Sequence, residues 1–573
     1  MNRIPPPPRC AERVTAAYRR IAETDRPEVW ISLREESAVL AEARALDARI
    51  AAGEELPLAG TLVAVKDNID VAGLPTTAAC PAYAYTPDVS ASAVLRLVAA
   101  GAIVLGKTNM DQFATGLVGT RSPHGPVRNA LRPEKISGGS SSGSAVAVAL
   151  GIADVALGTD TAGSGRVPAA LNGIVGVKPT LGLVPTSGVV PAARSYDAVT
   201  VFARTLTEAQ LALAQMTGPD EADPRGRAWP DDVRLSAPPN PRIAVPRDED
   251  LAPLSDQARA AFHETVKRLE HAGAHTAVID VSPLLEAAKL LYDGALVAER
   301  YAAVGDFIAQ DPTAADPTVG AIILAAAGLP AHALVDDLER LDGYRAAARR
   351  ILSGFDALLL PTTTGHPDIA AVQADPVAIN ARLGTYTNFV NLLDLAAVAA
   401  PAGEADGSPF GVSVITRAFE DQVAIDIAAL LTAEQAPVPY PANGVDLAVF
   451  GAHLRHQPLN HQLTDAGARF RGEIRTAPAH RLIALDTTPP KPGLLRVPPP
   501  DGAAITGERW TLSPTALGHF LAALPAPMFL GRLELADGSW VLGFHTDPAA
   551  AEAGTDITAY GSWPAYLAER AGA

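Results

Sequence analysis

The sequence predicts an α/β fold, in which a large domain with a central mixed β-sheet flanked by helices precedes a smaller α+β C-terminal domain. Three observations favour this fold class. From Leu58 onward, short β-branched runs such as residues 61–65 and 103–105 alternate with alanine-rich helical stretches. Residues 436–444 contain three prolines and an Asn-Gly pair, which is typical of a linker between domains. The chain has 573 residues, enough to bury a large core.

The other elements of the large domain follow from periodicity. Residues 10–52 alternate charged and apolar side chains at helical spacing, and residues 255–310 have the same helical character. A strand is expected at residues 357–360, where apolar side chains form a short continuous run. Residues 219–241 are rich in proline, aspartate and arginine, so we expect an exposed loop there.

The predicted boundaries are residues 1–436 for the large domain, 437–444 for the linker and 445–573 for the small domain. Within the small domain, residues 528–535 and 541–544 are expected to form strands. The sequence contains no repeat of fixed period.

Composition and charge exclude several classes of function. A net charge of -17 makes nucleic acid and anionic membrane surfaces unexpected partners, because both require a basic surface. The two cysteines, Cys10 and Cys80, provide neither a disulfide framework nor a cysteine-based zinc site. We see no signal peptide and no apolar run long enough to span a bilayer. We therefore expect a cytoplasmic protein.

One motif match has the wrong structural context. Residues 101–108 fit the phosphate-loop pattern G-x4-G-K-[ST]. That pattern requires a flexible loop after a strand, but here the residues between the glycines are predicted to be the strand itself. Residues 91–100, before them, are predicted to be helical. We therefore do not expect nucleotide binding.

Two turns rich in glycine and serine are the strongest functional signal. They occupy residues 136–144 and 158–166, and an apolar segment separates them. Glycine lets the backbone approach a ligand closely, and backbone N–H groups in such a turn can stabilise an oxyanion. The alternative is a pair of flexible surface loops, which fits less well because apolar sequence flanks both turns.

A nucleophilic serine needs a base, and these two segments contain no histidine. Lys66 directly follows the apolar run at residues 61–65. Neutralising a lysine of pKa about 10.4 at pH 7 costs roughly 4.6 kcal/mol. Burial lowers a lysine pKa by several units, so a neutral lysine base is feasible. The alternative is a lysine whose stem packs on the strand while its ammonium reaches solvent.

These segments resemble the amidase signature family over roughly residues 25–435. The likeness lies in the Val-Lys-Asp-Asn segment at Lys66, in residues 105–109, and in the two glycine-rich turns. The resemblance implies that Ser164 is the nucleophile, Ser140 relays its proton and Lys66 is the base. It also implies a cis peptide bond before Ser140.

The resemblance further implies an oxyanion hole made by four backbone N–H groups, those of Thr161, Ala162, Gly163 and Ser164. Asp160 and Arg166 are expected to brace the loop rather than to take part in chemistry.

Departures from the general family pattern at residues 142–143 and 162–165, together with residues 111–122, resemble the allophanate hydrolase branch of the family. This branch hydrolyses allophanate, a carboxylated urea, to ammonia and carbon dioxide. The expected partner is therefore a small-molecule substrate, with no cofactor and no metal. We also expect a homodimer, the commonest closed assembly.

A substrate carboxylate requires a cation in the pocket. The resemblance assigns substrate binding to Tyr292 and Arg300. Eight residues on one ideal helix correspond to about 12 Å of rise and about 80° of rotation, so the two side chains would flank a small ligand. Arginine suits a carboxylate through its planar fork. The alternative is a surface arginine paired with Glu299 or Asp293.

The small domain contains a histidine cluster at His453, His456 and His461, whose spacing matches no zinc pattern. The domain resembles the C-terminal domain of allophanate hydrolases, which is thought to promote decarboxylation of N-carboxycarbamate. His453 and Asn460 are our candidates for that role. The alternative is a domain that only packs or dimerises.

Two other functions remain open from the sequence. One is a different amidase of this family, including the protein that supplies ammonia for tRNA-dependent transamidation. The other is a non-catalytic scaffold on the same fold.

Overall fold

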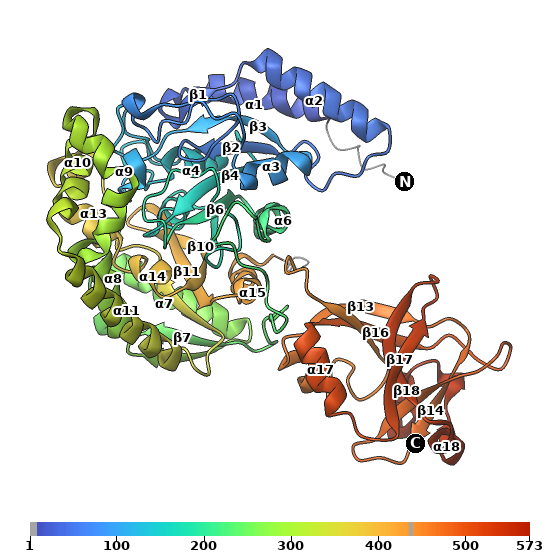
Figure 1. Cartoon of the computed structure of the whole chain (residues 1–573). Helices are drawn as coiled ribbons and strands as arrows, with labels where there is room; N and C mark the ends of the chain where they lie inside the picture. Colours follow the sequence, from blue (N-terminus) through green and yellow to red (C-terminus); the bar gives the residue numbers. More distant parts are fainter. Residues whose placement is uncertain (1–8, 435–438, 573) are drawn as a thin grey trace. The chain divides into compact units, whose positions relative to one another are not determined.

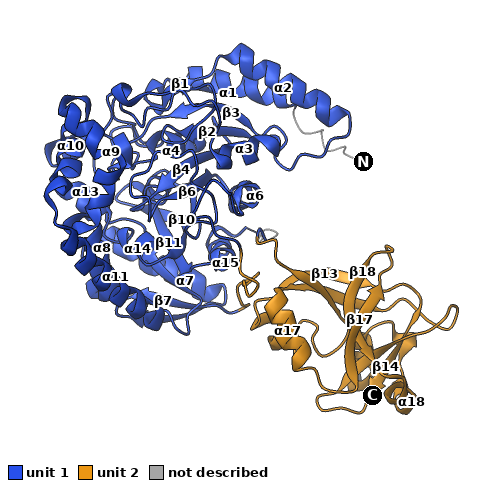
Figure 2. Cartoon of the chain, in the orientation of Figure 1, with its two compact units in different colours: residues 1–228, 240–440 blue, residues 229–239, 441–573 orange. Residues whose placement is uncertain are grey.

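The computed structural model describes residues 9–434 and 439–572, which form two compact units (Figure 2). Unit 1 comprises residues 1–228 and 240–440, and unit 2 comprises residues 229–239 and 441–573, each within the described ranges. The predicted boundary at residue 436 and residues 437–438 of the predicted linker lie outside the described residues.

Unit 1 is built on an eleven-stranded mixed sheet with the order β1-β3-β2-β4-β6-β5-β10-β11-β9-β7-β8 (Figure 1). The strands are β1 Trp30–Leu33, β2 Leu62–Lys66, β3 Ile103–Thr108, β4 Val155–Asp160, β5 Val175–Lys178, β6 Ala198–Ala203, β7 Arg242–Pro246, β8 His275–Ile279, β9 Ala357–Pro361, β10 Leu395–Ala405 and β11 Ser408–Arg417. Strand β2 runs parallel to both β3 and β4. All three strands are buried along their whole length, which explains why the sequence shows continuous apolar runs there.

Helices flank this sheet (Figure 1). They are α1 Cys10–Thr24, α2 Glu36–Ala51, α3 Ser92–Ala99, α4 Ser142–Ala149, α5 Val167–Leu171, α6 Leu206–Met216, α7 Asp256–His271, α8 Ser282–Asp293, α9 Ala298–Gln310, α10 Pro317–Leu324, α11 Ala331–Ile351, α12 Ile369–Ala374, α13 Ala378–Leu383, α14 Asn388–Leu392 and α15 Asp421–Thr432. Helix α4 is made only of Ser, Gly, Ala and Val, and every residue from Ser142 to Val148 is buried. Small side chains let this helix pack against the sheet, so its N-terminus lies in the interior.

The predicted α/β class with a mixed central sheet is confirmed. The predicted strands at residues 61–65, 103–105 and 357–360 correspond to β2, β3 and β9. The phosphate-loop match falls on β3, which follows helix α3, so the strand interpretation of residues 103–108 is also confirmed.

Two short strands lie in segments that were expected to be helical. Strand β1 interrupts residues 10–52, and β8 interrupts residues 255–310. Both are edge strands of the sheet. Strand β8 has no fully buried residue, so no apolar pattern marks it in the sequence.

The expectation of an exposed loop at residues 219–241 is wrong for its second half. Residues 229–239 belong to unit 2. Trp229, Val233 and Leu235 are buried, and the Leu235 N–H donates to the carbonyl of Gly467 at 2.9 Å. Their burial depends on residues more than 200 positions later in the chain, which local composition does not reveal.

Unit 2 contains a five-stranded sheet of order β13-β16-β12-β18-β17 and a three-stranded sheet of order β15-β14-β19. The strands are β12 Val445–Val449, β13 Arg469–Arg475, β14 His480–Leu485, β15 Lys491–Arg496, β16 Thr506–Leu512, β17 Met528–Glu534, β18 Trp540–Thr546 and β19 Thr555–Asp556. The helices are α16 His461–Thr464, α17 Pro514–Ala522, α18 Pro548–Ala553 and α19 Trp563–Gly572. The predicted strands at residues 528–535 and 541–544 correspond to β17 and β18. One apolar cluster, which includes Trp510 and Phe544, forms the core.

Within the described ranges, no single helix combines the length and apolar character needed to cross a membrane. One helix pair, Pro317–Gly328 with Ala331–Ile351, meets the test only jointly and is bent by 103°.

Candidate active site

The candidate catalytic residues lie where two neighbouring parallel strands end. Lys66 is the last residue of β2, and Asp160 is the last residue of β4. The two strands pair in register, with Val65 opposite Leu157. The carboxyl ends of parallel strands share one edge of a sheet, which is where α/β folds place their ligands. The glycine-rich turn before α4 reaches the same edge and carries Ser140.

Lys66 and Ser140 are in direct contact. The Lys66 Nζ lies 2.8 Å from the Ser140 Oγ and 2.7 Å from the Thr159 Oγ1. Lys66 and Ser140 have no solvent exposure. The peptide bond between Gly139 and Ser140 is cis, as the family resemblance implies. The alternative of a lysine reaching solvent is therefore wrong.

Burial controls the charge of this lysine. Desolvation lowers the pKa of Lys66 to about 7, and the positive charge of Arg300 adds to the decrease. Three aspartates act in the opposite direction on this pKa: Asp111, Asp197 and Asp160. In the described part of the chain, none of them forms an ion pair with Lys66. Burial therefore favours the neutral form of Lys66 near pH 7, and a neutral amine can accept a proton from Ser140.

The loop at residues 160–166 is rigidly braced. The Asp160 carboxylate accepts hydrogen bonds from the N–H groups of Gly163, at 2.8 Å, and Gly165, at 3.0 Å. The guanidinium of Arg166 pairs with both oxygens of Asp160 at 2.9 Å. Burial by itself raises the pKa of Asp160, but the charge and hydrogen bonds of Arg166 hold the pKa below its ordinary value. This geometry agrees with the bracing role expected for Asp160 and Arg166.

The same brace corrects the predicted oxyanion hole. Because the N–H of Gly163 donates to Asp160, it is engaged within the loop and is not directed at a substrate. We therefore remove Gly163 from the predicted donors and retain Thr161, Ala162 and Ser164. Gly163 has a positive φ of 123°, and a Cβ at this position would collide with the Thr387 side chain. The glycine is needed for this conformation rather than for a hydrogen bond.

Ser164 sits in the middle of this braced loop. Its side chain is buried, and its Oγ lies 3.5 Å from the carbonyl oxygen of Gly116, a long and weak contact. Thr387 supports the loop by donating from Oγ1 to the carbonyl of Ala162 at 2.6 Å. The Ser164 hydroxyl is thus only weakly held, while the backbone around it is fixed.

Tyr292 and Arg300 do meet, but not through the predicted single helix. Helix α8 ends at Asp293, a short turn follows, and Arg300 lies in α9. This break brings the side chains into contact, with the Arg300 Nη2 donating to the Tyr292 hydroxyl at 2.8 Å. The ideal-helix spacing of the pair is therefore wrong. Helix α8 ends before Gly294, and the turn that follows brings the two side chains into a direct hydrogen bond instead of leaving them apart along one helix.

Arg300 is a buried cation without a carboxylate partner in the described part of the chain. Its side chain is 1% exposed, and its Nη1 donates to the Thr115 Oγ1 at 2.9 Å. Its Nε has no hydrogen-bond partner among the described residues. The alternative of a surface arginine paired with Glu299 or Asp293 is therefore wrong. A buried guanidinium that lacks a counter-ion favours an anionic ligand beside it.

Three residues near the site were not singled out from the sequence. Thr159 contacts Lys66, Thr115 contacts Arg300, and Asp197 accepts a hydrogen bond from the Thr161 hydroxyl. Burial raises the pKa of Asp197. Thr159 lies inside the glycine-rich motif, and its place beside Lys66 follows once β2 and β4 are known to be parallel. Thr115 lies within residues 111–122, which carry part of the family likeness, but its contact with Arg300 is not visible there. Nothing local marks Asp197, because its partner is distant in the sequence.

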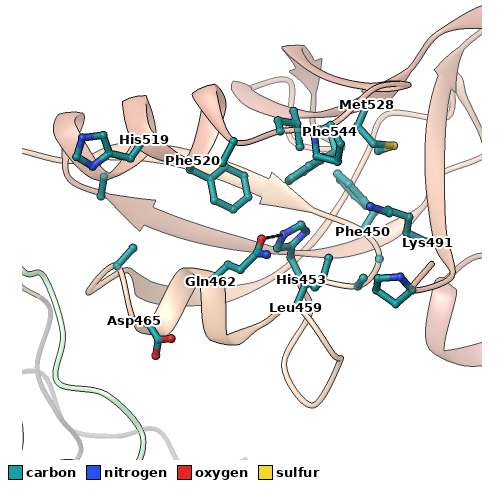
Figure 3. Close-up of a pocket in the computed structure, with 18 of the residues that line it drawn as sticks. Phe450, His453, Leu459, Gln462, Asp465, Lys491, His519, Phe520, Met528 and Phe544 are labelled. Atoms are coloured by element: carbon teal, nitrogen blue, oxygen red, sulfur yellow. Dashed lines mark hydrogen bonds between the residues drawn. The ribbon is translucent and has the colours of Figure 1, made fainter. Parts of the chain in front are cut away.

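Unit 2 contains a separate cavity of about 810 Å³ in which His453 is a lining residue (Figure 3). The His453 Nε2 lies 2.9 Å from the Gln462 Oε1, and the ring stacks on Phe544 with centroids 5.0 Å apart. Burial lowers the pKa of His453. Lys491 also lines the cavity and gives it a cationic group. The neutral imidazole and the ammonium lie on a largely apolar wall that also includes Arg234, His519, Asp232 and Asp465.

Asn460, the other candidate in unit 2, has a different position. Its Nδ2 donates to the backbone carbonyl of His453 at 2.9 Å, and it is not among the cavity-lining residues. The structure therefore makes Asn460 a support for the His453 backbone. His456 and His461 form no metal-binding cluster with His453 within the described ranges.

A buried lysine that contacts one serine, close to a braced turn that carries a second serine, can perform acyl transfer without histidine. Together with the mixed-sheet fold, this pattern defines the class, and the chain is an amidohydrolase. It belongs to the amidase family, whose model matches residues 12–424. Residues 445–568 match the allophanate hydrolase C-terminal domain.

Known relatives cover both parts of the chain. A urea amidolyase from Lachancea kluyveri is 41% identical over 570 residues, and the match covers 94% of this chain but 31% of that relative. The chain thus spans under a third of the length of that enzyme. The structure of Kluyveromyces lactis allophanate hydrolase matches with a TM-score of 0.87 and 37% identity, covering 98% of this chain and 97% of that one. A glutamyl-tRNA(Gln) amidotransferase component from Roseiflexus castenholzii is 35% identical over 445 residues, covering 72% of this chain and 89% of that relative.

Proposed function

We propose that this chain hydrolyses allophanate to ammonia and carbon dioxide through an acyl-enzyme on Ser164. The observation that carries the proposal is the buried guanidinium of Arg300, which has no carboxylate partner in the described part of the chain and lies beside the Tyr292 hydroxyl. The likeness to allophanate hydrolase and urea amidolyase supports the same substrate.

Substrate binding begins with the carboxylate of allophanate. Arg300 supplies a planar pair of donors for two carboxylate oxygens, and the Tyr292 hydroxyl supplies a further donor. A local cation is required because the chain carries a net charge of -17, which opposes the approach of an anion. The carboxylate then fixes the urea carbonyl relative to Ser164.

The acyl transfer proceeds in two steps. In the first, the Ser164 Oγ attacks the terminal amide carbonyl, and its proton passes to Ser140 while the Ser140 proton passes to neutral Lys66. The N–H groups of Thr161, Ala162 and Ser164 stabilise the oxyanion. The relay then returns a proton to the leaving nitrogen, which departs as ammonia. In the second step, water attacks the acyl-enzyme through the same relay and releases N-carboxycarbamate.

N-carboxycarbamate then loses carbon dioxide as one C–N bond breaks and the nitrogen takes up a proton, and the carbamate that remains takes up another proton and breaks down to ammonia and a second carbon dioxide. We assign the first of these decarboxylations to the cavity of unit 2. Of the polar groups that line the cavity, we assign His453 and Lys491 to a dianionic ligand, and the largely apolar wall favours loss of charge from the carboxylate (Figure 3). Asn460 supports His453 through its backbone carbonyl. If unit 2 only packs or dimerises, replacing His453 will leave carbon dioxide release unchanged.

The main rival is ammonia release from glutamine, as in the amidotransferase relatives. The Roseiflexus castenholzii relative matches only 72% of this chain, whereas the allophanate hydrolase structure matches 98%. A non-catalytic scaffold is disfavoured because Lys66, Ser140 and Ser164 are all present and the first two are in contact. We further infer a cytoplasmic homodimer, which size-exclusion chromatography with light scattering and cell fractionation will test.

A substrate panel tests the proposal. Ammonia release by the full chain is measured from allophanate, glutamine and simple amides, with Arg300→Ala measured beside the wild type. We expect allophanate to have the highest kcat/KM and Arg300→Ala to raise the KM for allophanate strongly. Faster release from glutamine or from neutral amides would overturn the substrate assignment.

A further inference from the structure

Unit 1 contains a cavity of about 650 Å³ that is lined by arginines. Arg345 and Arg349 lie four residues apart on α11, Arg417 is the last residue of β11, and the others lie in loops. The arginines are Arg194, Arg225, Arg227, Arg345, Arg349 and Arg417. Six guanidinium groups around one cavity are unexpected in a chain whose net charge is -17.

Three of these arginines already have acidic partners. The pairs are Arg227 with Asp394 at 2.8 Å, Arg345 with Asp342 at 3.1 Å, and Arg417 with Glu420 at 2.8 Å. Arg345 and Arg417 also donate to backbone carbonyls. These contacts hold the guanidinium groups in place and make them part of the cavity wall.

The other three arginines, Arg194, Arg225 and Arg349, are exposed, and no side-chain partner is found for them among the described residues. The aspartates that line the cavity form no ion pair with them in the described part of the chain. Asp223 accepts from the N–H of Thr186 at 2.6 Å, and Asp394 is held by Arg227. The six arginines outnumber the carboxylates that line the cavity or pair with its arginines, and three of the guanidinium groups have no side-chain partner among the described residues.

Asp197 occupies the part of this cavity nearest to the catalytic loop. It lines the cavity and accepts a hydrogen bond from the Thr161 hydroxyl, and backbone N–H groups of Ala192 and Ala193 also donate to it. Neither Tyr292 nor Arg300 lines the cavity. The cavity is therefore distinct from the contacts proposed for the substrate carboxylate at Tyr292 and Arg300.

We propose that this arginine cavity binds a compact multivalent oxyanion, one that carries carboxylate or phosphate groups at two or more positions. Arginine forks recognise both groups bidentately, and three unpaired forks around one cavity match a ligand with several anionic groups better than a single carboxylate. The site is additional to the proposed amidohydrolase site and does not depend on it.

Titration calorimetry on the full chain tests this site, with citrate and pyrophosphate as probes and sodium chloride at matched ionic strength as the blank. We expect one ion per chain to bind. The double variant R194A/R349A should weaken binding roughly tenfold or more, because each lost charge-assisted contact is costly. Tighter binding of citrate identifies carboxylates as the ligand groups, and tighter binding of pyrophosphate identifies phosphates.

Two further variants make the test specific. Arg350→Ala is the matched control, because Arg350 follows Arg349 on α11, is exposed and does not line the cavity. R194K/R349K keeps the charge but loses the fork, and should bind with intermediate affinity. The proposal is overturned if neither probe binds above the chloride blank, or if R194A/R349A binds as tightly as R350A.

Discussion

Replacing Lys66 by methionine is expected to remove a pH-dependent cost to the stability of unit 1 while abolishing turnover. Lys66 is fully buried, and desolvation lowers its pKa from 10.5 to about 7. Between these two values the unfolded chain binds more protons than the folded chain, so the stability of the wild type rises with pH. At about 1.4 kcal/mol per pH unit, the free energy of unfolding of the wild type at pH 7 is roughly 4 kcal/mol lower than that of a chain with a neutral side chain at position 66.

Methionine has a similar length and no charge, so this pH-dependent loss disappears in Lys66→Met. The hydroxyls of Ser140 and Thr159 lose their contact with Nζ, which costs about 1–3 kcal/mol per group at every pH. The difference in unfolding free energy between variant and wild type should therefore fall by roughly 3–4 kcal/mol from pH 7 to pH 10.

Urea unfolding of both proteins at pH 7 and pH 10 measures this difference. The control is Lys267→Met on α7, whose side chain is exposed in the folded state and should show no comparable pH-linked change. If the difference in unfolding free energy between Lys66→Met and the wild type is the same at both pH values, the claim that burial lowers the pKa of Lys66 is refuted.

Four other predictions address the site. The kcat/KM for ammonia release from allophanate should rise about tenfold between pH 6 and pH 8 as Lys66 loses its proton; a flat profile contradicts a lysine base. Arg300→Lys should raise KM by roughly tenfold with a smaller change in kcat, since the charge remains but the fork is lost; an unchanged KM removes Arg300 from the pocket. Gly163→Ala should lower kcat strongly, because alanine is strained at a φ of 123° and its Cβ would collide with Thr387; an unchanged kcat contradicts a loop conformation that requires glycine. His453→Ala should leave the first ammonia release unchanged and slow the release of carbon dioxide, which infrared spectroscopy measures. If the variant releases carbon dioxide as fast as the wild type, unit 2 takes no part in the chemistry.

Much of the candidate active site could be predicted from the sequence, because Lys66, Ser140 and Ser164 lie in contiguous motifs. Strand β2 is a continuous apolar run, so its end at Lys66 can be located from the sequence. Asp160, at the end of β4, was found through the glycine-rich motif of residues 158–166 rather than through a predicted strand. The contact between Lys66 and Ser140 was implied by the family resemblance, and the structure gives it a distance and a cause for the lowered pKa.

The features that the sequence did not reveal depend on backbone detail or on distant partners. A helix break after Asp293 replaced the expected spacing of Tyr292 and Arg300 by a direct contact. The Gly163 N–H was predicted to face the substrate, but it donates to Asp160. This hydrogen bond depends on the conformation of the loop, which the sequence does not reveal. Residues 229–239 looked like a surface loop because their burial in unit 2 depends on residues far along the chain.

The most direct test of the central claim is mass spectrometry of the full chain after rapid mixing with allophanate and acid quenching. We predict that an acyl group derived from allophanate is found on the peptide that contains Ser164, and that Ser164→Ala forms no adduct and releases no ammonia above background. An adduct on another residue, or ammonia release retained in Ser164→Ala, would contradict the account.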